Sequence, residues 1–461
     1  MGLGFLINAV SNPNTHFEGV DFNPLHIAHA QGLADAADIE NVTLREASFQ
    51  DLVLEIKEGQ HDLDLIVLHG ILTWVSIEAQ EAIVEIARKR LKPGGFLYVS
   101  YNCMPGWAPV LPLQRLMREN AKRTAGRSDA QTAAGLDLVQ GLLNEGAGYF
   151  AATPSLASRI EKMFKLEKNY LAHEYLNANW YIFHVSDVAA MFGKAKLEFI
   201  CSATVVENID NFSIPSGVRS RIAAEADPIF RETLRDVAAN KQFRRDIFAK
   251  GASTTLPAEQ AALFSRMSFA LVVPRSKVNL KFASPLGEIE GSPDMYNPVL
   301  DLLAHGSATL AELISLPVFQ SGSGAGVALQ IVSLLVHSGQ ILPVPMGSTF
   351  DPSAAQRFNR VIADKMSQGR NLNFLAAPHA GSGIQASNIE LLLLAAIFEQ
   401  PEISAKDLAV ELDRKMRAIG INWVENGQAV VDAGESLARS RRDVDLFVDE
   451  KLPIWRQLGV I

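Results

Sequence analysis

The sequence predicts an α/β fold over its first hundred residues, with a parallel sheet flanked by helices, and mainly helical regions after it. Three observations lead to this prediction. Short apolar runs alternate with helical patterns up to about residue 105, the run over 63–70 is almost wholly apolar, and turn residues separate the elements. Strands that alternate with helices favour right-handed crossover connections and therefore a parallel sheet.

The first elements follow a turn that contains two glycines. Gly2 and Gly4 flank one leucine and precede a helical run, a pattern that normally follows a buried strand. His16–Asp21 has the pattern of a strand. We expect Asn23 to be the N-cap of the next helix, with Pro24 at the first helical position, because both residue types favour these positions.

The next elements continue the alternation. We predict strands over Val42–Ala47 and Leu63–Gly70, and we expect the second to be buried on both faces because it is nearly all apolar. An amphipathic helix, SIEAQEAIVEIARKRL, follows Val75. The turn LKPGG ends this helix and leads into a fourth strand over Phe96–Ser100.

Beyond this sheet the pattern is mainly helical. Residues 107–195 combine helical and irregular patterns, whereas Leu197–Val205 has strand character and is expected to rejoin the sheet. Helical patterns resume over Val218–Phe248, and Ser253–Gln260 has the composition of a hinge. Phe269–Phe282 then suggests a β-hairpin.

The C-terminal half suggests two further regions. After the predicted hairpin, the order helix, turn, helix, helix and short strand is that of a winged-helix module. From Asn388 the pattern is helical, with Ser404 as an N-cap. The predicted domains are a Rossmann-like core over 1–106 that lacks its first strand, an inserted regulatory and substrate region over 107–252, a winged-helix-like domain over 253–375 and a helical domain over 376–461.

Composition and charge disfavour several classes of function. A formal charge of −9 gives no general attraction to nucleic acid or to an anionic membrane, and residues 297–345 contain no lysine or arginine for a recognition helix. The two cysteines, Cys103 and Cys201, support no disulfide framework. The apolar run Leu391–Phe398 is too short to span a bilayer. We therefore expect a cytoplasmic protein without nucleic-acid binding or membrane insertion.

The glycine turn and an acidic residue predict a nucleoside site. Asp21 ends the first predicted strand, seventeen positions after Gly4, close to the roughly 20 residues expected for a carboxylate that binds ribose hydroxyls. Phe22 follows it. Because no full phosphate cradle is evident, S-adenosylmethionine, which has no phosphate, is the favoured ligand.

Other candidate cofactor residues follow the next two strands. Ser48 and Phe49 would supply a polar cap and an apolar wall for adenine, and His69 and Gly70 would lie near the methyl-donor centre. Each has a simpler explanation that the sequence leaves open. Asp21 would then cap the following helix, Phe49 would be a core residue, and His69 would be an ordinary loop histidine.

The position of the glycine turn leads to one expectation about the start of the sequence. Met1 would lie inside the cofactor turn, and the strand that should precede it is missing. We therefore expect this chain to bind the donor more weakly than a chain extended upstream, as calorimetric titration of both would show.

Four longer strings resemble a known family. GVDFNPLHIAHAQ, LIVLHGILTWVS, LKPGGFLYVSYNCMPGW and LAHEYLNANWYIFHVSDVA together resemble bacterial methyltransferases that carry a methyltransferase regulatory domain, a group that includes rickettsial protein lysine methyltransferases. NKQFRRDIF, over 240–248, resembles the end of that regulatory domain. The resemblance implies a class I fold that binds S-adenosylmethionine, a C-terminal winged-helix domain, methyl transfer to lysine side chains of a protein, and a homodimer.

Candidate catalytic residues come from two of these strings. Tyr101 and Asn102 follow the fourth strand at its C-terminal end, where ligands bind in open α/β sheets. Glu174, Tyr175 and Trp180 would provide a carboxylate and aromatic walls for an amine.

Neighbouring residues have other roles in this interpretation. Trp107 would line the lysine channel, although packing is the simpler role for Trp107 and Trp180. His173 is a further candidate base. No metal site is expected, because position 177 is asparagine where a zinc helix would have a second histidine. Arg244 and Arg245 are expected on a solvated face.

Two other functions remain open. A methyltransferase that acts on a small molecule would show the same sheet, and a labelled metabolite without labelled protein would favour it. A non-catalytic scaffold or dimer partner would fit a truncated cofactor turn. Failure of an extended chain to bind the donor would favour that alternative.

Overall fold

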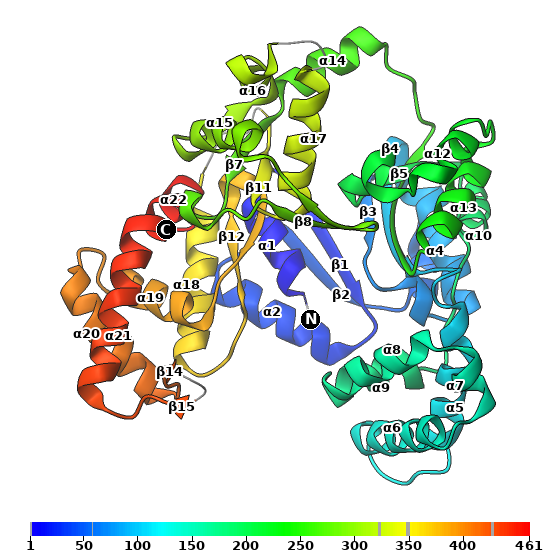
Figure 1. Cartoon of the computed structure of the whole chain (residues 1–461), viewed down its shortest axis with the longest axis horizontal. Coiled ribbons are helices and arrows are strands. Elements are labelled where there is room, and N and C mark those ends of the chain that lie inside the picture. Colours follow the sequence, from blue (N-terminus) through cyan, green and yellow to red (C-terminus); the bar gives the residue numbers. More distant parts are fainter. Residues whose placement is uncertain (1, 58, 321–323, 347–350, 426–427) are drawn as a thin grey trace. The chain divides into compact units, whose positions relative to one another are not determined.

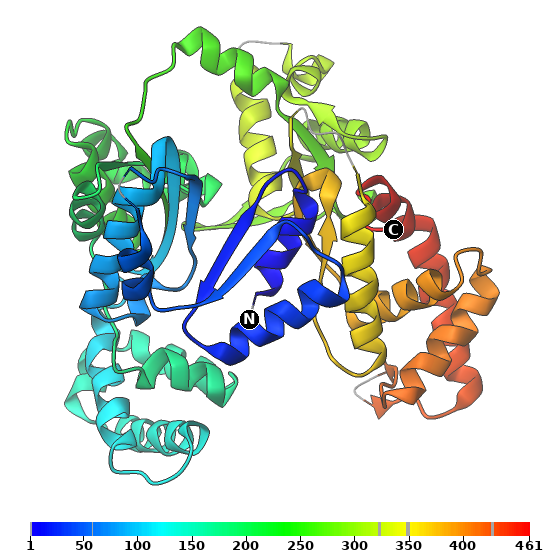
Figure 2. The same ribbon diagram turned by 180° about the vertical axis from the view of Figure 1, so that it is seen from behind.

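The computed structural model describes residues 2–57, 59–320, 324–346, 351–425 and 428–461. The chain divides into two compact units, shown in Figures 1 and 2. One unit comprises 1–48, 255–283 and 288–461, and the other comprises 49–254 together with 284–287. Each unit is described here by itself.

The unit over 49–254 contains a four-stranded sheet in the order β3-β4-β6-β5. Its strands are β3 (Leu63–Leu68), β4 (Leu91–Asn102), β5 (Leu197–Ser202) and β6 (Phe243–Lys250). β3 and β4 are parallel, whereas β6 runs antiparallel to both β4 and β5. The prediction that the segment at 197 rejoins the sheet is therefore confirmed, because β5 pairs with β6.

The segment over 243–250 corrects the prediction of helices up to Phe248. It forms strand β6, which lies between β4 and β5. Its sequence, FRRDIFAK, places Arg244 and Asp246 on the buried side of the strand with Phe248. Charged residues at buried positions hide the period-two apolar pattern that would have identified this strand. β4 also begins earlier than predicted, at Leu91.

Strand β3 corrects a second expectation, because only one of its faces is buried. On that face Leu97, Val99 and Phe248 pack against Ile83 and Phe192, from helices α4 (Ile77–Arg90) and α10 (Val185–Gly193). The opposite face exposes Leu65 and Val67 of β3, at 54% and 58%. An apolar run marks strand structure but does not show how many of its faces are buried.

A second core of this unit is formed by helices that lie between β4 and β5 in the chain: α5 (Leu111–Ala121), α6 (Ser128–Asn144), α7 (Gly148–Ala152), α8 (Ser155–Phe164) and α9 (Lys168–Leu176). The unit also contains α3 (Phe49–Glu55), before β3, and α11 (Asp210–Ser213), α12 (Ser216–Ala223) and α13 (Pro228–Ala239), between β5 and β6. Leu113, Leu136 and Leu171, from α5, α6 and α9, are fully buried in this core.

The other unit begins with a helix and two parallel strands. They are α1 (Leu3–Ser11), β1 (Phe17–Asp21) and β2 (Val42–Glu46), with α2 (Pro24–Ala36) between the strands. The predicted cap is confirmed, because the Asn23 side chain accepts a hydrogen bond from the Leu25 amide and Pro24 opens the helix. Leu6 and Val10 of α1 lie in the same core as residues of α18 (Ser353–Ser367).

The middle of this unit corrects the hairpin predicted over Phe269–Phe282. Strand β7 (Ser268–Leu271) pairs with β10 (Ala308–Thr309) and β11 (Ile341–Val344), whereas β8 (Lys281–Ser284) pairs with β9 (Gly287–Glu290). The two predicted hairpin strands thus belong to different sheets, since pairing depends on partners distant in sequence. The helices here are α14 (Pro257–Arg266), α15 (Pro293–Ala304), α16 (Leu310–Ile314) and α17 (Gly324–His337).

The C-terminal segment of this unit is mainly helical, as predicted. Ser404 caps α20, accepting a hydrogen bond from the Asp407 amide. No helix among the described residues is long and apolar enough to cross a membrane. The elements are β12 (Phe374–Ala377), β13 (Ser382–Gln385), α19 (Asn388–Glu399), α20 (Ala405–Ala418), β14 (Val424–Glu425), β15 (Gln428–Ala429), α21 (Ala433–Leu446) and α22 (Leu452–Gln457).

The two compact units group segments that are distant in the chain. Residues 1–48 group with the C-terminal half, and residues 49–106 group with the region up to 254. The division near 254 falls within the predicted hinge over 253–260. The four predicted domains remain a sequence prediction.

Candidate functional site

An aromatic cluster lies in the unit over 49–254, where the chain leaves strand β4. Trp107 follows this strand and is 6% exposed. Its ring centroid lies 5.6 Å from that of Trp180 and 6.3 Å from that of Tyr175 on α9. The segment that carries Trp180 is held against the end of β4, because the Phe183 amide donates to the Asn102 carbonyl. Three of the aromatic residues considered from the sequence therefore form one cluster.

Glu174 is the titratable group of this cluster. Burial raises the pKa of its carboxyl to about 7, and the charge of Arg159 opposes this rise. Among the described residues the Glu174 carboxylate has no hydrogen bond and no ion pair. A carboxylate that is desolvated but unpaired is suited to accept a proton near neutral pH.

The neighbouring histidine has a different environment. The His173 ring lies 4.7 Å from the ring of Trp74, and burial lowers the pKa of this histidine. Trp74 belongs to a 3₁₀ turn over Leu72–Trp74, just after β3. His173 therefore packs against the end of β3, while Glu174 lies within the electrostatic influence of Arg159.

Arg159, on α8, completes the cluster. Its guanidinium carbon lies 4.3 Å from the centroid of the Trp107 ring, a cation–π geometry. Among the described residues, Arg159 makes this cation–π contact but no hydrogen bond or ion pair. Its charge also acts on Tyr170 and Tyr175 of α9.

The two predicted residues at the end of β4 have distinct surroundings. Tyr101 is 1% exposed, and its hydroxyl donates to Asp246 at 2.6 Å. Asn102 is 6% exposed; its amide nitrogen Nδ2 has no partner in the part of the chain that is described, and its backbone amide donates to the Thr73 hydroxyl. The Trp180 Nε1 is a second buried donor without a partner.

Tyr101 belongs to a buried ionic network that the sequence analysis did not find. Arg244 is 3% exposed, which corrects the expectation that it lies on a solvated face, whereas Arg245 is exposed. The Arg244 guanidinium pairs with Asp246 at 2.8 Å, Asp236 at 2.6 Å and Glu232 at 2.9 Å. Burial raises the pKa of Asp236 to about 7. This network joins β4, β6 and α13.

Asp21, the predicted ribose ligand, ends β1 in the other unit. Its two oxygens accept hydrogen bonds from the Asn23 amide at 2.9 Å and from His26 Nδ1 at 2.8 Å. The carboxylate therefore binds groups at the start of α2, as expected if Asp21 stabilises this end of the helix. About a third of the side chain remains exposed, and each oxygen keeps a lone pair for another donor. Phe22 beside it is 77% exposed.

The two glycines of the opening turn differ from each other. Gly2 has a left-handed conformation with φ of 78°, and a Cβ atom there would come within 2.7 Å of the Ala30 Cβ on α2. Gly4 lies inside α1, and a Cβ atom there would meet nothing within 4 Å. Close packing of two helices therefore accounts for Gly2. Met1 lies outside the described residues.

The remaining predicted cofactor residues belong to both units. Ser48 ends the segment 1–48, and Phe49 begins α3 and packs partly buried against the sheet core. His69 Nδ1 lies 2.9 Å from the Tyr98 hydroxyl, and the left-handed Gly70 donates its amide to the Ser100 hydroxyl at 2.8 Å. Burial and the charge of Arg245 lower the pKa of His69.

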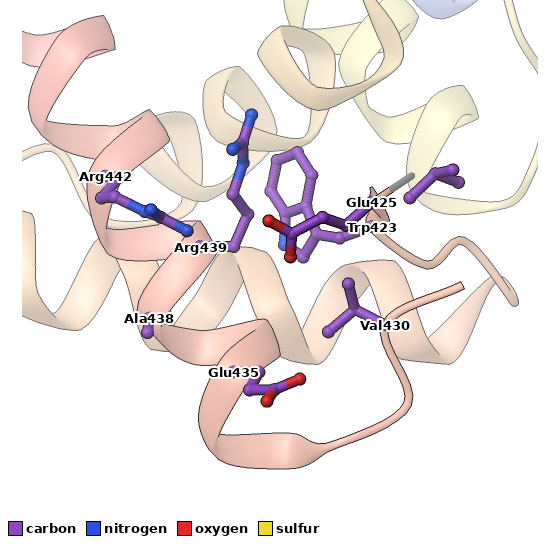
Figure 3. Close-up of a pocket in the computed structure, with 8 residues that line it drawn as sticks. Trp423, Glu425, Val430, Glu435, Ala438, Arg439 and Arg442 are labelled. Carbon is purple, nitrogen blue, oxygen red and sulfur yellow. The ribbon is translucent and has the colours of Figure 1, made fainter. Parts of the chain in front are cut away.

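A small cavity lies apart from all these residues, in the C-terminal part of the chain (Figure 3). It has a volume of about 200 Å³ and is lined by Trp423, Glu425 and Val430 from the β14–β15 hairpin region and by Arg439 and Arg442 from α21. Arg439 lies 5.6 Å from the Trp423 ring and pairs with Asp443. None of the predicted site residues lines this cavity.

The sequence analysis did not single out Arg159 of the aromatic cluster or Trp74, which packs against His173. Arg159 lies in a helical segment with no distinctive motif, so its position over Trp107 has no signal in the sequence. Trp74 carried a weak signal, because it follows the apolar strand β3 at its C-terminal end, where ligands gather in open α/β sheets.

Comparison with known proteins defines the class. A family described as "Methyltransferase domain" matches residues 2–147, and one described as "Predicted methyltransferase regulatory domain" matches residues 167–250. The second match ends where β6 ends, in agreement with the resemblance noted for residues 240–248. The fold and these matches define a methyltransferase with an added regulatory region.

Relatives and solved structures extend the match over the whole chain. "Uncharacterized protein sll1526" of Synechocystis is 32% identical, over 100% of this chain and 90% of that protein. "Uncharacterized protein RP789" of Rickettsia prowazekii is 25% identical, over 53% of this chain and 43% of that protein. The structure of "PKMT2 from Rickettsia typhi in complex with AdoHcy" has a TM-score of 0.70 at 19% identity, covering 100% of this chain and 91% of that chain.

This chain therefore belongs to the bacterial class I methyltransferases that carry a methyltransferase regulatory domain. The predicted fold class, the enzyme class and the cofactor S-adenosylmethionine are confirmed.

Proposed function

We propose that this methyltransferase transfers methyl groups from S-adenosylmethionine to lysine side chains of a protein. The supporting observation is Glu174, a desolvated carboxylate with no hydrogen bond or ion pair among the described residues, which precedes Tyr175 of the aromatic cluster and feels the charge of Arg159 over the Trp107 ring. The fold is shared with a protein named PKMT2, which is consistent with the proposal. An amine acceptor needs these two features, a proton acceptor and aromatic walls.

The chemistry assigns a role to each feature. A lysine in water has a pKa of about 10.4, so it reaches the enzyme as an ammonium ion. The Glu174 carboxylate takes a proton from this ion, which leaves a neutral amine whose lone pair is the nucleophile. Aromatic faces attract the methylated ammonium product and exclude water from the amine.

The donor supplies a methyl group bonded to a sulfonium sulfur, which leaves as a thioether. For the protein the task is to hold and orient this group. Asp21 fits a role in binding ribose hydroxyls, because its carboxylate keeps accepting capacity after its bonds to Asn23 and His26. We extend the same proposal, residue by residue, to Gly2, Gly4, Phe22, Ser48, Phe49, His69 and Gly70.

The remaining predicted residues take supporting roles. Tyr101 is a positioning residue, since its buried hydroxyl is engaged by Asp246. Asn102 offers an unpartnered amide donor at the end of β4, which suits a carbonyl of the acceptor. We also propose a cytoplasmic homodimer; sedimentation of the purified protein would test the dimer.

One experiment tests the proposal and its alternatives. The protein is incubated with S-adenosylmethionine that carries a labelled methyl group and with a bacterial lysate, and proteins are separated from metabolites. Label recovered as methyl-lysine after protein hydrolysis is the expected result. Label in metabolites alone would support a small-molecule methyltransferase. Donor binding by calorimetry without any transfer would support a scaffold.

The matched variant is Glu174→Gln, which keeps the shape of the side chain and removes the base. We expect it to bind the donor normally and to transfer methyl groups much more slowly. Normal transfer by this variant would remove Glu174 from the proposal.

A further inference from the structure

The aromatic cluster already holds a cation. The Arg159 guanidinium lies over the Trp107 ring at 4.3 Å, and Trp107 is only 6% exposed. The face of this tryptophan that would receive an acceptor ammonium ion is therefore occupied by a side chain of the enzyme itself. Trp180 meets the same ring nearly at right angles, at 79°, so it does not occupy that face.

The attachment of Arg159 is weak. No hydrogen bond or ion pair anchors the guanidinium among the described residues, although its charge acts on Glu174. By contrast, the buried Arg244 has three carboxylate partners. Arg159 can thus leave the ring without breaking a hydrogen bond or an ion pair to a described residue.

We propose that Arg159 is a specificity-determining residue, a resident cation that an acceptor ammonium ion must displace from Trp107. The inference rests on the proposed function for the nature of the acceptor. While the guanidinium lies over the ring, its positive charge disfavours any other cation there, so an ammonium ion binds this face only by displacing Arg159.

The test uses a probe that requires no methyl transfer. Tetramethylammonium chloride is titrated into the full-length chain, with binding followed by calorimetry. Arg159→Met should bind the probe about 2- to 30-fold more tightly than the parent protein, because a cation–π contact of about 0.5–2 kcal/mol no longer competes for the ring. Arg159→Lys should restore weak binding.

Two further variants make the result specific. Lys162→Met removes a positive charge from the exposed side of the same helix and should leave probe affinity unchanged. Arg159→Met combined with Trp107→Phe should lose much of the gained affinity, because phenylalanine keeps the aromatic packing but attracts cations less strongly. Thermal melts of each variant establish that it is folded.

The outcomes separate this inference from the proposed function. If Arg159→Met binds the probe no more tightly than the parent, or if Trp107→Phe has no effect, the resident-cation role is wrong even where lysine methylation occurs. If the probe results hold while no lysine is methylated, the inference stands and the proposed acceptor fails. With a lysine peptide as acceptor, Arg159→Met should lower KM more than it changes kcat.

Discussion

Two arginines of one unit have opposite surroundings. Arg244 lies in the ionic network of β4, β6 and α13, 5.5 Å from the Phe199 ring, with three carboxylates and a tyrosine hydroxyl within the same network. Among the described residues, Arg159 lies over Trp107 with no ionic partner, and Glu174, on which its charge acts, has none either. In the first arrangement the guanidinium is held by three carboxylates, which fixes its position. In the second arrangement, Arg159 and Glu174 are charged groups without an ion-pair partner among the described residues, which is typical of a functional site.

The largest expected effect concerns the unpaired carboxylate. Glu174→Gln should reduce methyl transfer about 10²–10⁴-fold, as loss of a general base does. In the parent protein, kcat/KM should fall about tenfold per pH unit below 7, because protonation of a carboxyl with a pKa of about 7 removes the base. A pH profile with a labelled donor measures both effects. If the fall in kcat/KM below pH 7 persists in Glu174→Gln, a group other than Glu174 causes it.

The next effect concerns the satisfied arginine. Arg244→Met should reduce the free energy of unfolding by about 3–5 kcal/mol, because it leaves buried carboxylates without their partner. Arg159→Met should change it by no more than about 1 kcal/mol, since only one ring contact is lost. Denaturation in urea, followed by circular dichroism, measures both. Equal effects of the two substitutions would contradict the comparison.

A third prediction concerns the effect of Glu174 on how stability depends on pH. Folding raises the pKa of Glu174 from 4.5 to about 7. Between these two pH values the folded state therefore binds more protons than the unfolded state. The free energy of unfolding consequently falls as pH rises through that range. Glu174→Gln should therefore stabilise the protein at pH 8 by about 1–3 kcal/mol and have little effect at pH 4. Thermal melts at both pH values test the sign, and a loss of stability at pH 8 would refute it.

The smallest effect concerns the tyrosine of the ionic network. Tyr101→Phe removes one hydrogen bond to Asp246, which keeps its pair with Arg244. We expect a loss of about 1 kcal/mol in the free energy of unfolding. Methyl transfer should change little in addition, since Tyr101 is a positioning residue. A large loss of kcat with unchanged stability would instead place its hydroxyl at the reacting atoms.

Local signals explain what could be predicted of the fold. The caps at Asn23 and Ser404 depend on side chains within a few residues, and the parallel strands depend on short apolar runs, so both could be found from the sequence. Strand β6 could not, because Arg244 and Asp246 occupy its buried positions and interrupt the apolar pattern. The hairpin predicted over 269–282 failed for a similar reason, since its strands pair with distant segments.

The candidate site divides in the same way. By itself the sequence determined the class of fold and the donor, and it predicted Glu174, Tyr175 and Trp180 as candidate site residues, because residue type and the string around them carry that information. Only the tertiary structure decided that Glu174 is desolvated, that Arg159 covers Trp107 and that Arg244 is buried. These properties depend on segments that meet after folding, and the electrostatic environment of a side chain is created by neighbours the local sequence does not contain.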